Sequence, residues 1–219
     1  MPSVVLSLGG ALAAEVAPVV TVTPLPLKWV LLAGLAAGVL RFVWGAICWM
    51  VLKHHDDDWR GVGDDGGVEA ALAKADLAPG WFYLLPFHKD VEGGARGKAF
   101  AERMARGPNA MIVALPAGGC MGGAVFLKGF LLNLLEGLGL ALLVCVLWDS
   151  RAVHVDTLGE TMAGCAAVGL LASISVHFMA SVWMGMPWRH TWSSTFDLVV
   201  GYALAGGLLY WLAGPVGLL

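Results

Sequence analysis

The sequence predicts an all-α membrane protein with four transmembrane helices and a small cytoplasmic α+β insertion between the first and second helices. The composition is 58% hydrophobic and 13% charged, and that charged fraction is about half of what a soluble domain carries. Four apolar runs each reach the roughly 20 residues that a bilayer requires. One long polar stretch separates the first run from the second, and this stretch predicts the insertion.

The predicted spans are residues 28–52, 122–148, 161–188 and 196–218. Residues 1–27 are also apolar, but no basic residue precedes Lys28, so the basic start of a signal peptide is missing. Prolines at 18, 24 and 26 interrupt any helix that would continue into the first span. We therefore expect residues 1–27 to form an interfacial segment.

Basic residues predict the orientation. The segment between the first two spans and the turn between the last two hold nine Lys or Arg residues, and the opposite side holds only Lys28 and Arg151. Positive charge stays on the cytoplasmic side of a membrane. The pattern predicts a multi-pass protein of the inner membrane, with residues 53–121 in the cytoplasm and both termini outside.

The insertion has its own pattern of elements. Residues 68–76 and 98–106 suit short helices, while residues 80–86 and 110–116 are apolar, end in proline and suit strands. The two strands could pair, but a two-stranded sheet alone is marginally stable. We expect the insertion to pack on the membrane surface or on a partner protein.

Charged and polar residues inside the spans are the first candidate site. Arg41 lies near the middle of the first span, Glu136 and Asn133 near the middle of the second, and His177 within the third. A central charge costs roughly 2.5 to 3.5 kcal/mol on insertion scales, so an Arg41–Glu136 ion pair is expected. Arg41, Glu136 and His177 could form a proton or ion path, a structural pair with a hydrogen-bonded histidine, or contacts with another subunit.

Two histidine-containing groups are weaker metal candidates. His54 and His55 precede three aspartates where the first span ends, and imidazole with carboxylate can bind zinc, nickel or copper. The second group is His177, Met179, Met184, Met186 and His190, whose thioethers and imidazoles suit Cu(I). His177 could alternatively ligate a haem or chlorin. Adjacent residues rarely converge on one ion, and Met often fills apolar helices, so the sequence predicts no cofactor.

Small residues predict close helix contacts. Gly34 and Gly38 lie four residues apart in the first span, and Gly201 and Ala205 do so in the fourth. Such faces allow helix backbones to approach one another. The spacing leaves open whether the contacts are internal or with another subunit.

Two segments carry a resemblance. Trp49 to Trp59 reads WMVLKHHDDDW at the exit of the first span, and residues 196–202 read FDLVVGY in the last span. In this layout the chain resembles small bacterial four-span membrane proteins of unknown function, although its first loop is longer. The resemblance implies the topology alone and carries over no catalytic or binding residue.

The functional expectation is a non-catalytic accessory or structural subunit of a larger bacterial membrane complex. Energy-converting and electron-transport complexes are one class in which such subunits occur. The sequence holds no nucleophile elbow, zinc-protease, phosphate-loop or dinucleotide motif, and its net charge of −3 argues against nucleic acid. The expected partners are other membrane subunits and the lipid bilayer. The alternatives are a small oligomeric transporter or channel using Arg41, Glu136 and His177, and a metal- or haem-handling membrane protein.

Overall fold

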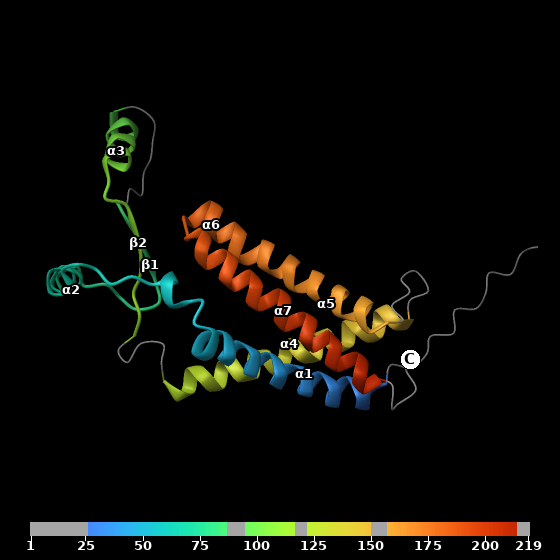
Figure 1. Cartoon of the computed structure of the whole chain (residues 1–219). Helices are drawn as coiled ribbons and strands as arrows, with labels where there is room; N and C mark the ends of the chain where they lie inside the picture. Colours follow the sequence, from blue (N-terminus) through green and yellow to red (C-terminus); the bar gives the residue numbers. More distant parts are fainter. Residues whose placement is uncertain (1–25, 87–94, 117–121, 150–156, 214–219) are drawn as a thin grey trace, which may run out of the picture.

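A computed structural model describes residues 26–86, 95–116, 122–149 and 157–213. The predicted interfacial segment lies outside the described residues except for its last two positions, and so does Arg151. Long helices make up most of the described chain, together with one small sheet (Figure 1).

Four helices are long and apolar enough to cross a membrane, judged by length and composition, as the sequence predicts. The first is α1 (Leu27–Ile47), which a π-turn (Cys48–Leu52) extends, and the second is α4 (Gly123–Asp149). The third is α5 (Leu158–Ser173), which a π-turn (Ile174–Phe178) joins to α6 (Met179–Met184), and the fourth is α7 (Trp188–Ala213). The first three are near their predicted positions.

The start of the last helix differs from the prediction, because α7 begins at Trp188 and not near residue 196. The polar residues of its first turns are helical, since their hydroxyls find partners inside the structure. The Thr195 hydroxyl donates to the Thr191 carbonyl at 2.6 Å and meets the Ser173 hydroxyl of α5 at 2.5 Å. Thr191 likewise meets Ser181 of α6. Hydroxyls that bond to the preceding turn or to a neighbouring helix are satisfied without leaving the helix.

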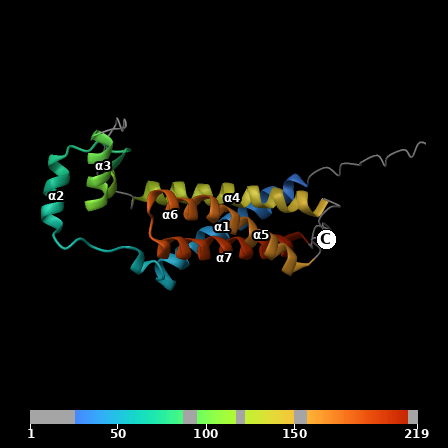
Figure 2. The same cartoon turned by 90° about the horizontal axis from the view of Figure 1, so that it is seen from above.

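The four long helices lie in the spatial order α4, α1, α7, α5 (Figures 1 and 2). The helices α1 and α4 approach closely along the predicted glycine face. A Cβ added at Gly38 would lie 2.6 Å from the Leu134 Cα, and one added at Gly34 would lie 2.8 Å from the Leu138 Cα. In α7, Gly201 packs against the Trp44 ring and Ala205 is fully buried. The small-residue faces therefore make contacts within the chain.

The insertion contains α2 (Asp65–Lys74), β1 (Phe82–Leu85), α3 (Ala95–Arg106) and β2 (Ala110–Val113). The strands pair antiparallel, with Phe82 opposite Val113 and Leu85 opposite Ala110. This order of elements and the pairing confirm the predicted α+β insertion. It projects from one end of the helical bundle in both views (Figures 1 and 2).

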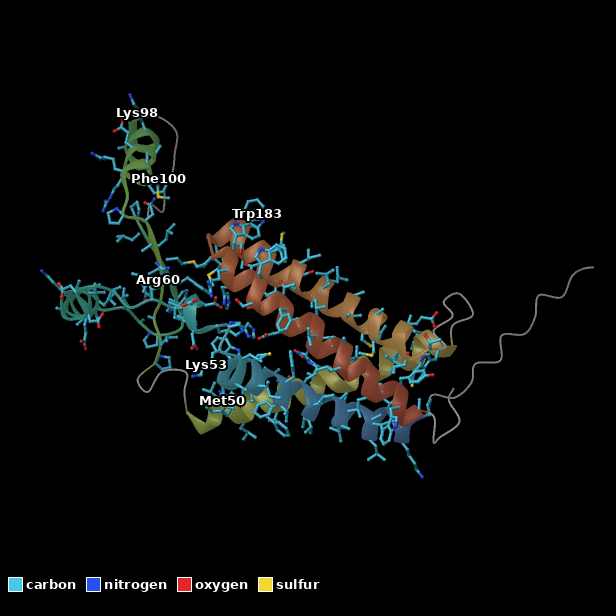
Figure 3. All side chains as sticks on the ribbon, viewed as in Figure 1. Met50, Lys53, Arg60, Lys98, Phe100 and Trp183 are labelled. Carbon is cyan, nitrogen blue, oxygen red and sulfur yellow. The ribbon has the colours of Figure 1, made fainter. Side chains whose placement is uncertain are left out.

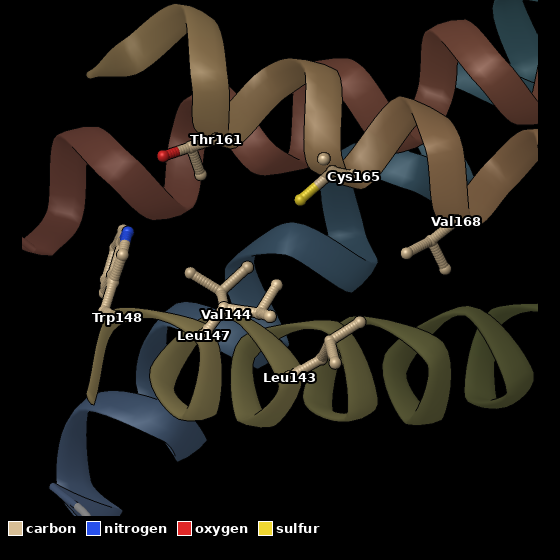
Figure 4. Close-up of a pocket in the computed structure, with 8 residues that line it drawn as sticks. Leu143, Val144, Leu147, Trp148, Thr161, Cys165 and Val168 are labelled. Atoms are coloured by element: carbon tan, nitrogen blue, oxygen red, sulfur yellow. The ribbon is translucent and has the colours of Figure 1, made fainter. Parts of the chain in front are cut away.

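A small cavity of about 20 Å³ lies between α4 and α5, and Figure 4 shows its lining. Leu143, Val144 and Leu147 face Cys165 and Val168 across it. A cavity of this size has room for about one water molecule, but an apolar lining offers that water few partners. We therefore assign this cavity no function.

Candidate metal centre

The exit of α1 turns the chain back toward α7. The π-turn ends at Leu52, Lys53 adopts a left-handed conformation with φ 54°, and residues Asp56–Asp58 form a short 3-10 turn. Figure 3 labels Met50 and Lys53 at this end of the bundle. A left-handed residue commonly ends a helix, and π-turns are frequent at functional sites. The reversal places His54, His55 and Asp58 against the first turns of α7.

His55 is the centre of the resulting cluster. Its Nδ1 lies 2.7 Å from Asp58 Oδ2, and its Nε2 lies 2.9 Å from Asp197 Oδ2. The ring is 2% exposed and stacks on Trp49, with 4.1 Å between the ring centroids and 6° between the planes. Both ring nitrogens therefore face carboxylate oxygens, one from Asp58 and one from Asp197.

Asp58 joins the cluster to α7. Its side chain is 1% exposed, His190 Nδ1 lies 3.0 Å from its Oδ2, and the Ser193 hydroxyl donates to the same oxygen at 3.1 Å. Burial alone would raise the pKa of Asp58, but the hydrogen bonds from His55, His190 and Ser193 outweigh it and hold the pKa below its usual value of 3.8. The ionised carboxylate thus stabilises the fold above that usual pKa, and the stabilisation is lost as pH falls through the lower folded pKa.

Asp197 links this group to a second one. Its Oδ1 lies 2.7 Å from His54 Nε2, and its Oδ2 receives His55. Cys48, which is fully buried, completes a Cys48–His54–Asp197 group beside the His55–Asp58–His190 group. In each group, one donor atom per residue lies within 4.8 Å of the others. His54 and His55, which the sequence offers as one candidate metal site, thus belong to different groups.

The His55–Asp58–His190 group has ligand types and spacings that fit a metal. Bonds of about 2.0 to 2.1 Å in a tetrahedral site separate the ligand atoms by roughly 3.4 Å. Both histidine nitrogens now lie at hydrogen-bond distance from Asp58, so a small outward movement would admit an ion. A metal-bound histidine usually donates its other ring N–H to a carboxylate. Asp197 already occupies that position on His55.

The structure contains the predicted ion pair between Arg41 and Glu136. Arg41 Nη2 lies 2.6 Å from Glu136 Oε2, with the Arg41 side chain 9% exposed and that of Glu136 43% exposed. The guanidinium also lies 3.9 Å above the Tyr202 ring. Asn133 donates locally to the Gly129 carbonyl at 2.8 Å. The pair joins α1 to α4.

His177 does not join the pair. Its ring lies near His190, with 6.1 Å between the centroids in a T-shaped arrangement. The predicted group of Arg41, Glu136 and His177 is therefore split between two places. Met184 of the predicted copper group is 55% exposed, and His190 turns its Nδ1 to Asp58.

Sequence reasoning missed the role of Asp197 and the pairing of Asp58 with His190. One signal was present: His190 and Asp197 are seven residues apart, which is two helical turns on one face. The other half of the site comes from a reversal at Lys53, for which the sequence has no glycine signal.

The chain matches no family model, no curated protein and no solved structure.

Proposed function

We propose that this chain is a multi-pass membrane protein that binds a divalent transition metal of the zinc type through His55, Asp58 and His190. The observation that supports the proposal is the convergence of two imidazoles on one buried carboxylate, with a second carboxylate on the far nitrogen of His55. Two imidazoles and a carboxylate form a common ligand set for zinc, and for non-haem iron when positions stay open.

Three protein ligands leave one position of a tetrahedral ion free, as in sites where the metal acts on another molecule. Metal binding to His55 would displace the Nδ1 proton, because the ligand must be the neutral imidazole. Asp197 would hold the Nε2 proton and orient the ring. The metal would thereby replace the hydrogen-bonded contact between His55 and Asp58 with a coordinated one.

The experiment compares two neighbouring aspartates. The full chain is purified in a gentle detergent, stripped of metal, loaded with zinc alone and analysed by elemental mass spectrometry. We expect about one zinc per chain in the wild type, and affinity at least roughly tenfold weaker in Asp58→Asn and in Asp197→Asn. Asp57→Asn is the matched control, because Asp57 is 73% exposed and contacts Arg189 outside the group.

Equal zinc binding by Asp58→Asn and Asp57→Asn would overturn the proposal, as would a wild-type chain that retains no stoichiometric zinc. Size-exclusion profiles of the variants show whether each remains folded. His190→Gln provides a second ligand test, because His190 is only partly buried and its loss leaves the His55 contacts in place.

We also propose that the four helices lie in an inner membrane with the insertion on the cytoplasmic side. The four candidate spans support the membrane location. The direction is supported by the eight Lys or Arg residues within residues 53–121, against Lys28 and Arg151 on the opposite side.

A second candidate function is that of an accessory subunit, with the insertion as the surface that meets a partner. Trp81 and Phe82 are 67% and 68% exposed, and Leu84, Leu85 and Val113 of the same sheet are exposed as well. Because side chains alternate between the faces of a strand, Phe82, Leu84 and Val113 share one exposed apolar face. An exposed apolar face of this kind marks an interaction surface. The same gentle purification tests this: a chain that co-purifies at fixed stoichiometry should be lost in the Trp81→Ser, Phe82→Ser variant. Retention of such a chain by that variant would count against the assignment.

A further inference from the structure

A cysteine, a histidine and an aspartate meet where the end of α1 lies beside α7. Cys48 begins the π-turn after α1, His54 follows the reversal at Lys53, and Asp197 belongs to α7. The His54 Nε2 lies 2.7 Å from Asp197 Oδ1, and the Cys48 thiol donates a hydrogen bond to the same carboxylate. One ligand atom from each of the three residues lies within 4.8 Å of the others. A thiol, an imidazole and a carboxylate therefore converge on one point.

Neighbouring side chains hold this group in position. The Trp44 Nε1 donates to the Asp197 carbonyl at 3.0 Å and so ties α1 to α7 at this level. The His54 ring stands edge-on to the Phe196 ring, with 5.5 Å between the centroids. Cys48 is fully buried, whereas the side chains of His54 and Asp197 are 26% and 18% exposed. An ion would therefore reach the group from the side of the histidine and the aspartate.

The two oxygens of Asp197 serve different neighbours. Its Oδ2 lies 2.9 Å from His55 Nε2 and so supports the His55–Asp58–His190 group, while its Oδ1 faces His54. The two groups thus share no ligand atom. The geometry calls for two separate ions and not for one ion shared between the groups.

The chemistry of the Cys48–His54–Asp197 group suits a divalent metal that accepts sulfur. Zinc binds thiolate, imidazole and carboxylate ligands in tetrahedral sites, and a thiolate favours softer ions than imidazole and carboxylate alone do. Binding would release the Cys48 proton, because the thiolate is the ligand. His54 would bind through Nε2 as the neutral imidazole, with its proton on Nδ1. The ion would replace the two hydrogen bonds that now meet at the Asp197 carboxylate.

We propose that Cys48, His54 and Asp197 bind a second divalent metal ion of the zinc type. This site does not rest on the His55–Asp58–His190 group, because the two share no ligand atom. It should be the weaker of the two, since His54 Nδ1 has no hydrogen-bond partner in the described part of the chain, whereas the far nitrogen of His55 meets Asp197. Loss of such an outer partner typically weakens metal binding about 10- to 100-fold. The first ion therefore binds at His55–Asp58–His190, and the second follows at higher free metal concentration.

Cobalt distinguishes the two sites, because a thiolate ligand gives a sulfur-to-cobalt charge-transfer band and the His55–Asp58–His190 group contains no cysteine. The full chain is purified in a gentle detergent, stripped of metal and titrated with Co²⁺ alone under nitrogen. Absorption spectra and elemental mass spectrometry are recorded at each step. We expect about two cobalt ions per chain at saturation, with the charge-transfer band rising as the second ion binds.

A matched pair of cysteine variants tests the thiolate. Cys48→Ser should abolish the charge-transfer band, and Cys145→Ser should retain it, because Cys145 is also buried but lies on α4 outside both groups. His54→Gln changes a partly exposed ligand and should weaken binding of the band-forming cobalt by roughly tenfold or more. His190→Gln should weaken only the other cobalt and keep the band. Failure of the proposed function and failure of this inference are therefore distinguishable.

Three results would overturn the second site. The first is a wild-type chain that shows no sulfur-to-cobalt band at saturating cobalt. The second is a band that survives in Cys48→Ser or disappears equally in Cys145→Ser. The third is a band that His190→Gln abolishes, because both groups would then hold one shared ion. Size-exclusion profiles show whether each variant remains folded.

Discussion

Arg41 and Glu136 show how much one charged residue within an apolar run can predict. The sequence places both near the middle of their helices, and a central charge needs a partner. The observed distance of 2.6 Å confirms the pair. Depth alone could not place His177, because its rotational position on the third helix directs its ring toward His190 and away from the pair.

Removing one member of the Arg41–Glu136 pair should lower the free energy of unfolding more than removing both members. Glu136→Gln leaves the guanidinium of Arg41 buried without its counter-charge, which we expect to cost about 3 kcal/mol, the low end for buried pairs because Glu136 is partly exposed. The double variant Arg41→Met, Glu136→Leu should recover most of that loss. Unfolding of the purified variants in a denaturing-detergent titration measures the difference. A double variant that is less stable than Glu136→Gln would contradict this account.

His55 and Asp58 show where residue-level prediction stopped. The histidines were visible as ligand types, but adjacent residues do not usually converge, and indeed His54 and His55 belong to different groups. Asp58 became a partner of both His55 and His190 only through the 3-10 turn. Tertiary placement of that turn decides the site, and no local pattern encodes it.

At the scale of the elements, hydrophobic runs predicted the helices within a few residues, except at the start of α7. The polar residues from Arg189 to Thr195 lower the local hydropathy, so the predicted span starts after them. They are nevertheless helical, because hydroxyls such as that of Thr195 bond to the preceding turn and to α5. The alternation of short apolar runs and turns likewise predicted β1 and β2. The order of the helices in space was not predictable from the sequence, because a small-residue face does not indicate which helix will pack against it.

The α1–α4 contact depends on the absence of a side chain at Gly38. Gly38→Ala would place a Cβ 2.6 Å from the Leu134 Cα, and we expect the overpacking to destabilise the chain by about 1 to 3 kcal/mol. Gly139→Ala is the control on α4, because its added Cβ meets nothing within 4 Å. Thermal unfolding in detergent compares the two. Equal stability would show that the helices separate at no cost, contrary to the packing described.

At the scale of the whole molecule, the proposed orientation places Lys28 and Lys74 on opposite sides of the membrane. Lys28 begins α1 and Lys74 ends α2 in the insertion, and both are exposed. A membrane-impermeant amine reagent applied to intact spheroplasts should modify Lys28 and spare Lys74, as read by peptide mass spectrometry. Lysed cells, in which both should react, provide the control. Preferential modification of Lys74 in intact spheroplasts would reverse the orientation.

Trp49 stacks one face of its indole on His55, yet the residue is 48% exposed. An indole stacked on a candidate metal ligand experiences any change at that imidazole, so zinc binding at His55 would alter the surroundings of Trp49. Tryptophan fluorescence measured with and without zinc should therefore change in the wild type, and the change should be smaller in Trp49→Phe. An equal change in that variant would show that the indole does not sense the metal group.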